Sequence, residues 1–354
     1  MSLDPVDAYI RSAMQQQHIP GLTLAVVQAG VVVKHQAYGL ASLELKVPMT
    51  VTTLFNIGAL TKMFTGTAIM TLIEAGKLAL TDTVGMLLSD LPASWHAITI
   101  EQLLTHTAGL PDLADSVAGT FIADTRDEAL RLITARALLS RPGENWRYVQ
   151  TGYVLLGMII ESLSGLPFER FLTQRFFRPL GMRATCFGDY KQVIPGRTSM
   201  YTCLERRDDA LVPSADQLWT FQYHCPAYAY PCAGLNMTVG DLVKWDAALS
   251  SGILLPPERL IMLWTSVKLA DGTPGGIVGT PFGYGRGWMV VDRPGHPWVG
   301  HEGGAATVYG RYLSDQLSII LLTNCRGAKP ITLLEGVTAH YLPTKQAQES
   351  GIVA

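Results

Sequence analysis

Two pairs of apolar, β-branched segments stand at opposite ends of the chain, at residues 22–27 and 31–38 and at residues 307–313 and 317–323. A short run of residues that favour turns separates the members of each pair, which is the spacing of a β-hairpin. A helical pattern of apolar positions follows the second pair, over residues 331–341. We expect the two ends of the chain to share one antiparallel sheet with the terminal helix on its face.

The middle of the chain has a different periodicity. Apolar residues recur there at helical spacing, with Pro or Gly at the segment edges. The segments are 59–75, 100–104, 125–139, 152–163, 168–176 and 239–249. The pattern predicts an α+β protein: a mostly helical lobe, about residues 59–279, inserted into a sheet lobe, about residues 1–58 and 280–354. We expect the lobes to form one unit, residues 1–354, with a ligand site in the cleft between them.

Composition narrows the class of protein. Of the 354 residues, 48% are hydrophobic and 16% charged, which is typical of a globular protein and excludes a disordered chain. The net charge is −2 and no basic run can pair with a series of phosphates, so we expect no nucleic-acid partner. No window of about 20 residues has the composition of a membrane span. The first residues lack a secretory signal, which predicts a cytoplasmic protein unless a signal has been removed.

The sequence indicates neither a disulfide framework nor a metal site. The five cysteines show no C-x-x-C spacing, so we interpret them as reduced and structural. His18, His35, His96 and His224 are not spaced with Asp, Glu or Cys as ligands on one element. We therefore expect no metal and no organic cofactor.

One charge interrupts an otherwise apolar segment. Residues 55–73 are apolar or small on nearly every face, which predicts a deeply buried helix, and Lys62 is the only charged residue among them. A buried ammonium either finds hydrogen-bond partners or loses its proton, although a lysine in a first turn can also extend its amine to solvent. Ala59 projects from the same face, directly after Gly58. This is the geometry of a base beside a nucleophile position, with a backbone amide for an oxyanion.

Three ordered elements resemble the serine β-lactamase and penicillin-binding-protein superfamily, in the branch of class C β-lactamases, their esterase relatives and D-amino-acid peptidases. Residues 55–62, FNIGALTK, are similar to that family's F-x-I-G-S-x-T-K segment, with Ala59 in place of the serine. Residues 148–150 (YVQ) resemble its Tyr-x-Asn segment, and residues 301–304 (HEGG) resemble its K-T-G or H-x-G element. Framework segments in the expected order extend the resemblance from about residue 19 to residue 324.

The resemblance implies a role for each matching residue. Ala59 marks the nucleophile position, and Lys62 would hold the hydroxyl of a serine there. Tyr148 would serve as base, provided that a cation such as Lys62 lowers its pKa. His301 would orient the substrate and join the proton network. The residues implied for oxyanion or substrate binding are Ala59, Gln150, Gly303 and Gly304.

Several of these residues also have an ordinary structural interpretation. Tyr148 can be a tyrosine that packs before a helix, Gln150 a polar residue at a helix start, and His301 a turn residue. We interpret His106, in a framework segment, as a structural hydrogen-bonding residue. The aromatic segment 219–230 either walls an acyl pocket, which we favour slightly, or packs on the helical lobe.

Alanine cannot attack a carbonyl, so we expect the chain to be nearly inactive as written. The resemblance implies a serine hydrolase that acts on an ester, amide or β-lactam substrate through an acyl-enzyme. Esterase or amidase activity is favoured, because His301 replaces the lysine of dedicated β-lactam enzymes. The alternatives are an acyltransferase of the same family and a natural, non-catalytic binding or regulatory protein. Retention of Lys62, Tyr148 and His301 favours a deliberate Ser→Ala substitution over a natural pseudoenzyme. The oligomeric state stays open.

Overall fold

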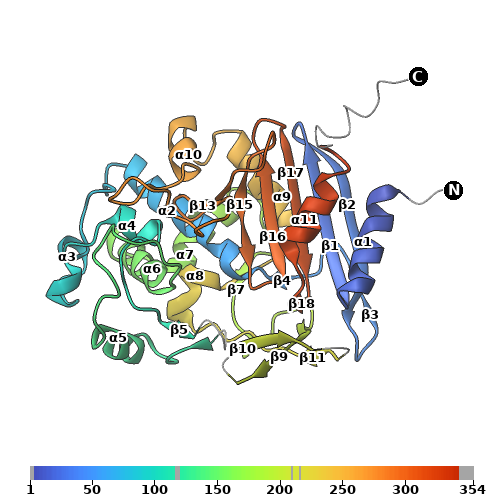
Figure 1. Cartoon of the computed structure of the whole chain (residues 1–354), viewed down its shortest axis with the longest axis horizontal. Helices are drawn as coiled ribbons and strands as arrows, with labels where there is room; N and C mark the ends of the chain where they lie inside the picture. The colour runs from blue at the N-terminus through green and yellow to red at the C-terminus, as the bar shows by residue number, and fades with distance from the viewer. Residues whose placement is uncertain (1–3, 116–119, 209, 215–216, 343–354) are drawn as a thin grey trace.

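A large antiparallel sheet forms the frame of the molecule (Figure 1). The computed structural model describes residues 4–115, 120–208, 210–214 and 217–342. The strands of the sheet, in spatial order, are β13 (Phe282–Tyr284), β14 (Met289–Val291), β15 (Trp298–Gly303), β16 (Thr307–Tyr312), β17 (Leu317–Thr323), β1 (Gly21–Gln28), β2 (Val31–Ser42) and β3 (Val47–Pro48). Because β1 pairs with β17, with Val26 opposite Ile319, the predicted sheet shared by the two chain ends is confirmed.

Both faces of this sheet are covered. Along β1, Leu22 and Leu24 pack in a core cluster with α1 (Pro5–Gln16) and α11 (Pro330–Thr338). The intervening Ala25 belongs to a second cluster, shared with α9 (Val239–Ser250) and the helical lobe. The alternation follows from the two-residue period of a strand, which places successive side chains on opposite faces. The sheet therefore separates the terminal helices from the lobe that holds the cleft.

The remaining helices gather on one side of the sheet, as Figure 1 shows. They are α2 (Thr61–Glu74), α3 (Val84–Leu87), α4 (Ile100–Leu104), α5 (Arg126–Thr134), α6 (Thr151–Ser164), α7 (Phe168–Leu172), α8 (Tyr230–Ala233) and α10 (Pro257–Leu263), with short turns η1 (Gly58–Leu60), η2 (Ala93–Trp95), η3 (Thr173–Phe177) and η4 (Ala227–Ala229). The predicted α+β class is confirmed, whereas the lobe boundaries stay a prediction. Among the described residues no single helix is long and apolar enough to cross a membrane; one pair, Thr151–Ser164 with Phe168–Phe177, bent by 71°, passes that test together.

Two predicted helices differ in their ends. The helix expected from residue 59 begins at Thr61, because Ala59 belongs to the 3-10 turn η1 that leads into α2. The helix expected over 125–139 ends at Thr134, where the chain passes through a turn and a bend toward Pro142. Ala59 is thus placed in a tighter turn than a regular helix provides, directly at the edge of the cleft.

Figure 1 shows short strands below the large sheet, and in the described part of the chain they form two three-stranded sheets and two strand pairs. They are β4 (Phe55–Asn56) with β12 (Leu235–Met237) and β7 (Cys186–Phe187); β8 (Tyr201–Thr202) with β11 (Trp219–Thr220) and β18 (Cys325–Arg326); β9 (Leu204–Arg207) with β10 (Ala210–Pro213); and β5 (Ala114–Asp115) with β6 (Thr120–Phe121). The parallel pairing of β18 with β8 carries the chain after the central sheet back toward the cleft. All five cysteines are free, in agreement with their interpretation as reduced residues.

Candidate active site

The turn that carries Ala59 packs against the end of strand β15. Gly58 adopts a φ of +55°, a conformation that costs a side-chain-bearing residue free energy. A Cβ atom at this position would lie 3.1 Å from the backbone nitrogen of Gly304, so the glycine also permits the close approach of the two segments. Gly58 N–H donates to Asn56 Oδ1 at 3.0 Å, which fixes the turn. The positive φ of Gly58 gives the chain a sharp entry into the helix, and this turn brings Ala59 beside Gly304.

Lys62 is fully buried behind Ala59. Its side chain has no solvent exposure, so the alternative in which the amine reaches solvent is wrong. Nζ donates to Gln150 Oε1 at 2.7 Å and to the Cys232 carbonyl at 3.1 Å, and it lies 4.8 Å from the centre of the Tyr148 ring. No carboxylate among the described residues lies within ion-pair distance of this amine. Burial lowers the pKa of Lys62 to about 8, so the amine is mostly protonated at neutral pH but loses its proton far more readily than an exposed lysine.

Tyr148 lies next to Lys62 but does not bond to it. Its Oη has no hydrogen-bond partner among the described residues, although the atom is buried. Burial raises the pKa of Tyr148 well above its ordinary value. The expectation that Lys62 lowers this pKa is therefore wrong for this chain, because the ammonium faces the ring and its protons go to Gln150 and Cys232. Tyr148 is a neutral phenol with a free hydroxyl.

His301 occupies the predicted place on strand β15 but is not among the residues that line the cavity with Ala59. Its Nε2 lies 2.9 Å from Tyr284 Oη and its Nδ1 lies 2.6 Å from the Glu302 carbonyl. Because a carbonyl only accepts, Nδ1 carries the proton and Nε2 accepts from the tyrosine. Burial lowers the pKa of His301 to about 3, so the ring is neutral at physiological pH. Its ring centre is 6.2 Å from that of Tyr148, which makes it a neighbour of the tyrosine rather than part of the cavity wall.

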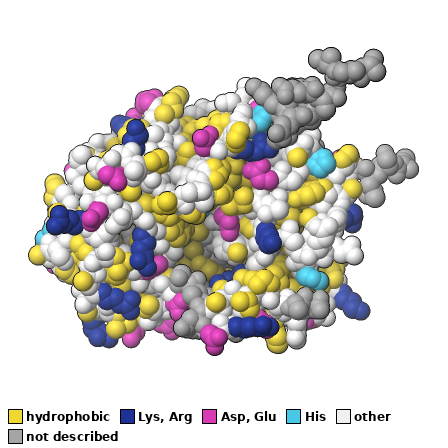
Figure 2. Space-filling view, viewed as in Figure 1, with side chains coloured by type: hydrophobic (Ala, Val, Ile, Leu, Met, Phe, Trp, Pro, Cys, Tyr) yellow, Lys and Arg dark blue, Asp and Glu magenta, His cyan; other side chains and the backbone are white. Residues whose placement is uncertain are grey.

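A cavity of about 270 Å³ joins the other predicted residues. Ala59, Tyr148, Gln150 and Gly304, contributed by three separate segments, all line it. Figure 2 shows the molecule hollowed near the middle of this face, with hydrophobic side chains around the hollow. Gly303 lies behind the wall, where an added Cβ would meet the Ile57 carbonyl at 2.0 Å. A carbonyl bound in this cavity would lie beside the residue-59 turn, the phenol and the Gln150 amide.

Sequence reasoning missed Asp112, which holds Gln150 in place. Asp112 Oδ1 accepts the backbone N–H of Gln150 at 2.8 Å and that of Ala114 at 3.2 Å. Burial raises the pKa of Asp112, and its side chain lines the cavity. Asp112 directly follows the framework segment that ends at Pro111. This position beside a family segment was the only signal in the sequence that could have pointed to Asp112.

Different residues of the aromatic segment 219–230 fulfil the two alternatives predicted for it, the wall of a pocket and packing in the helical lobe. Phe221 and Tyr223 line the cavity together with Ala59, as expected for the wall of an acyl pocket. Tyr228 and Tyr230 are buried in the core of the helical lobe instead. Sequence reasoning also missed Arg326, whose guanidinium lies 4.8 Å from the centre of the Phe221 ring. Its approach depends on the pairing of β18 with β8, which no local pattern indicates.

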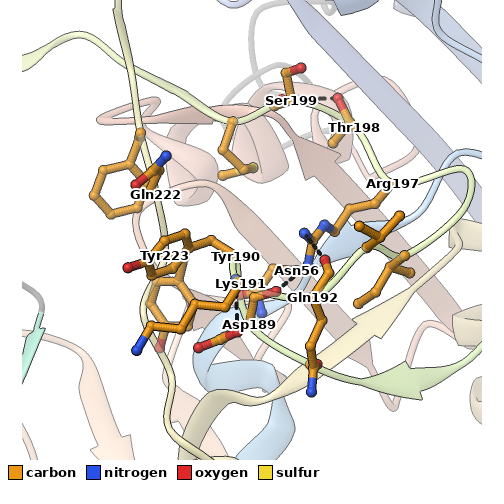
Figure 3. Close-up of a pocket in the computed structure, with 15 residues that line it drawn as sticks. Asn56, Asp189, Tyr190, Lys191, Gln192, Arg197, Thr198, Ser199, Gln222 and Tyr223 are labelled. Carbon is orange, nitrogen blue, oxygen red and sulfur yellow. Dashed lines mark hydrogen bonds between the residues drawn. The ribbon is translucent and has the colours of Figure 1, made fainter. Parts of the chain in front are cut away.

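A second cavity, of about 400 Å³, lies on the other side of Phe221 and Tyr223 (Figure 3). Its polar side chains mostly bond to their own loop: Arg197 donates to the carbonyls of Asp189 at 2.6 Å and of Gln192 at 2.8 Å. These bonds stiffen the wall that the two aromatic residues share. We place the candidate active site in the first cavity, because Ala59 and Gly304 line that one.

Comparison with known proteins gives one family for nearly the whole chain. The model of the family described as Beta-lactamase matches residues 6–335. Penicillin-binding protein 4* of Bacillus subtilis is 28% identical over 319 residues, which cover 85% of this chain and 67% of that protein. Protein flp of Staphylococcus aureus is 32% identical over 191 residues, or 52% of this chain. The matched part spans only 38% of the length of Protein flp.

Solved structures show the same fold. The octameric penicillin-binding protein homologue from Pyrococcus abyssi superposes with a TM-score of 0.79 at 26% identity, over 97% of this chain and 78% of that chain. D-amino acid amidase from Ochrobactrum anthropi SV3 gives a TM-score of 0.80 at 24% identity, over 97% and 99% of the two chains. EstCE1, described as a hydrolase with promiscuous acyltransferase activity, gives 0.76 at 22% identity, over 94% and 97%. The last two likenesses establish the shared fold.

Proposed function

The chain belongs to the beta-lactamase family, and from this premise we propose that it is a serine hydrolase in a nucleophile-less form: its cleft binds the carbonyl of an ester, amide or lactam, and with Ala59 in place of the serine it forms no acyl-enzyme. One observation carries the proposal: Ala59, Tyr148, Gln150 and Gly304 line one cavity, with the buried amine of Lys62 directly behind them. Acyl transfer needs a nucleophile, a proton acceptor and oxyanion donors. The chain has groups suited to the last two roles, and only the nucleophile is missing.

Part of the cavity wall is aromatic, beside the charged residues Asp112 and Arg326. Phe121, Phe221 and Tyr223 supply aromatic walls, which suit an apolar or aromatic acyl group. Burial keeps His301 neutral, so this position provides no fixed cation for a substrate carboxylate of the kind that lysine would supply. We therefore place esters and amides of hydrophobic acids before β-lactams as substrates of a nucleophile-restored chain.

The decisive experiment restores the hydroxyl with Ala59→Ser. We expect hydrolysis of p-nitrophenyl esters to rise by at least about 10³-fold over the parent chain, because a missing nucleophile costs orders of magnitude in rate. A phosphonate inhibitor should give a stable mass adduct with the variant and none with the parent. Thr61→Ser, two residues later at the first position of α2, is the matched control and should give neither result.

A binding protein is the rival function, and Ala59 itself is the observation that favours it. No gain of hydrolysis and no adduct with Ala59→Ser, in a folded variant, would contradict the hydrolase proposal and support the binding protein. An acyltransferase is distinguished by adding an alcohol or amine acceptor to the assay. Formation of the new ester or amide at the expense of the free acid would support transfer over hydrolysis.

A further inference from the structure

His106 holds Tyr148 from both sides along the backbone. The carbonyl of His106 accepts the N–H of Arg147 at 2.9 Å, and its Nδ1 accepts the N–H of Val149 at 3.3 Å. These two donors belong to the residues immediately before and after Tyr148. One residue thus fixes the main chain on each side of the phenol.

The imidazole also packs against the phenol itself. The ring centres of His106 and Tyr148 are 4.4 Å apart, and those of His106 and Tyr284 are 4.7 Å apart. His106 is 2% exposed, so its ring cannot move without displacing these neighbours. The contact sets the tilt of the Tyr148 ring, over whose face the Lys62 amine lies.

The conformation of His106 is unusual for a purely structural residue. Its φ is +61°, a region in which a side-chain-bearing residue is uncommon. Both contacts depend on this turn, because it places the carbonyl and the imidazole against the same segment, residues 147–149. Burial lowers the pKa of His106 well below its ordinary value, which keeps Nδ1 free to accept from Val149. A protonated ring would lose that bond.

Two buried polar atoms in this contact have no partner. His106 Nε2, which carries the proton of the neutral ring, and Tyr148 Oη are both unpaired among the described residues. Buried polar groups are ordinarily bonded, and each unpaired one requires an explanation. For Tyr148 the explanation is the adjacent cavity, which the residue lines. The phenol is held by its ring and its backbone, so that its hydroxyl stays free for a bound group.

We propose that His106 is a positioning residue for Tyr148: its backbone and ring fix the phenol against Lys62, and it acts on the reaction only through that phenol. The proposal rests on the proposed function, since it assigns Tyr148 to the proton-transfer step. It goes beyond the sequence interpretation of His106 as a framework residue. It also explains why a strained, buried histidine stands beside a cavity that it does not line.

A double-mutant cycle tests the proposal in the Ala59→Ser chain. With p-nitrophenyl ester as substrate, His106→Ala should lower kcat about 10- to 100-fold with KM within about twofold, because small displacements of a reacting group cost rates of this order. In the Tyr148→Phe background the same change should lower kcat less than about twofold, since the group it positions is gone. Equal losses in the two backgrounds would overturn the proposal.

His106→Asn provides the conservative variant. Asparagine tolerates positive φ and its side-chain oxygen can accept from Val149, so kcat should fall only about 3- to 10-fold. This variant also decides the question if His106→Ala does not fold. A loss with His106→Asn as large as with His106→Ala, or one that persists unchanged with Tyr148→Phe, would count against positioning. His96→Asn is the matched control: His96 bonds to the Leu91 carbonyl at 2.8 Å, away from the cavity, and kcat should not change.

A second readout is independent of catalysis. In the parent chain labelled with [ζ-¹³C]tyrosine, the Tyr148 resonance is assigned by its absence in Tyr148→Phe. We expect His106→Asn to shift this resonance and His96→Asn to leave it in place. An unshifted resonance overturns the positioning role. If Ala59→Ser is inactive while the resonance shifts, the proposed function fails and the positioning of Tyr148 stands.

Discussion

Two buried ionisable groups in this protein have opposite surroundings: one has a charged partner and the other has none among the described residues. On the sheet side, Asp246 of α9 is fully compensated. Its Oδ1 accepts from Tyr309 Oη at 2.5 Å, Arg311 Nη1 at 2.6 Å and Ser318 Oγ at 2.6 Å. At the cleft, Lys62 has two neutral acceptors and no ion pair among the described residues. Desolvation therefore dominates at Lys62 and lowers its pKa to about 8.

The difference separates a structural charge from a reactive one. A buried ion pair with satisfied hydrogen bonds fixes how two elements pack, here α9 against the strands β16 and β17. A buried amine without a counter-ion weakens the fold but exchanges protons near neutral pH, which is what acid–base chemistry requires. Substitutions at the two places should accordingly affect different properties.

The largest effect is expected at Lys62 in the Ala59→Ser chain. Lys62→Met keeps the length of the side chain and removes the amine, and it should lower kcat/KM for p-nitrophenyl esters by about 10²- to 10⁴-fold. Lys244→Met is the control, since that lysine bonds to Asp241 and is 47% exposed away from the cleft. Activity retained within about threefold in the Lys62 variant would remove the amine from the mechanism.

The structural charge should show the reverse behaviour. Asp246→Ala leaves the Arg311 guanidinium buried without its partner and should lower the free energy of unfolding by about 3–5 kcal/mol, measured by urea denaturation. In contrast, Lys62→Met in the parent chain should leave this free energy unchanged or raise it, because it removes an uncompensated charge. If Lys62→Met lowered the free energy of unfolding more than Asp246→Ala does, Lys62 and not Asp246 would be the structural charge.

The comparison also predicts a pH dependence. The pKa of Lys62 is about 8 in the folded chain and near the ordinary lysine value of 10.5 when unfolded. Between these values the unfolded chain binds more protons, so the contribution of Lys62 to stability rises with pH across this window, by about 2–3 kcal/mol in total. The difference in unfolding free energy between the parent and Lys62→Met isolates this effect from the cysteines and tyrosines. A difference that is flat or falls from pH 8 to 10.5 would show that the folded pKa is not lowered.

The spacing of apolar residues within single segments correctly predicted the secondary structure and the burial of those segments. The hairpins, the shared sheet and the burial of Lys62 follow from the periodicity of apolar residues within each segment. The convergence of Ala59, Tyr148 and Gln150 on one cavity followed from the resemblance to a known family. The sequence therefore indicated four of the residues that line the cavity, whereas His301 and Gly303, predicted for the same site, do not line it.

What the sequence did not indicate depends on contacts between distant segments. The raised pKa of Tyr148 reflects its burial by segments distant in the chain, and the part of Arg326 reflects the pairing of two short strands. His106 contacts the residues on either side of Tyr148 only because its own φ is positive. The residues around His106 in the sequence do not predict that conformation. Such features arise from tertiary packing, and no periodicity within a single segment carries them.

The smallest effect is expected at Glu74, a charged residue that solvent already reaches. Its substitution gives the reference value against which the effects at Lys62 and Asp246 are compared. Glu74 at the end of α2 pairs with Arg259 at 2.8 Å, and their side chains are 45% and 30% exposed. Solvent screens such a pair, so Glu74→Gln should change the free energy of unfolding by less than about 0.5 kcal/mol and leave the activity of the Ala59→Ser chain intact. Lys62 lies on the same helix, twelve residues earlier. A loss above about 1 kcal/mol at Glu74 would mean that any charge change on α2 destabilises the protein, and the contrast between Lys62 and Asp246 would then reflect the helix rather than burial.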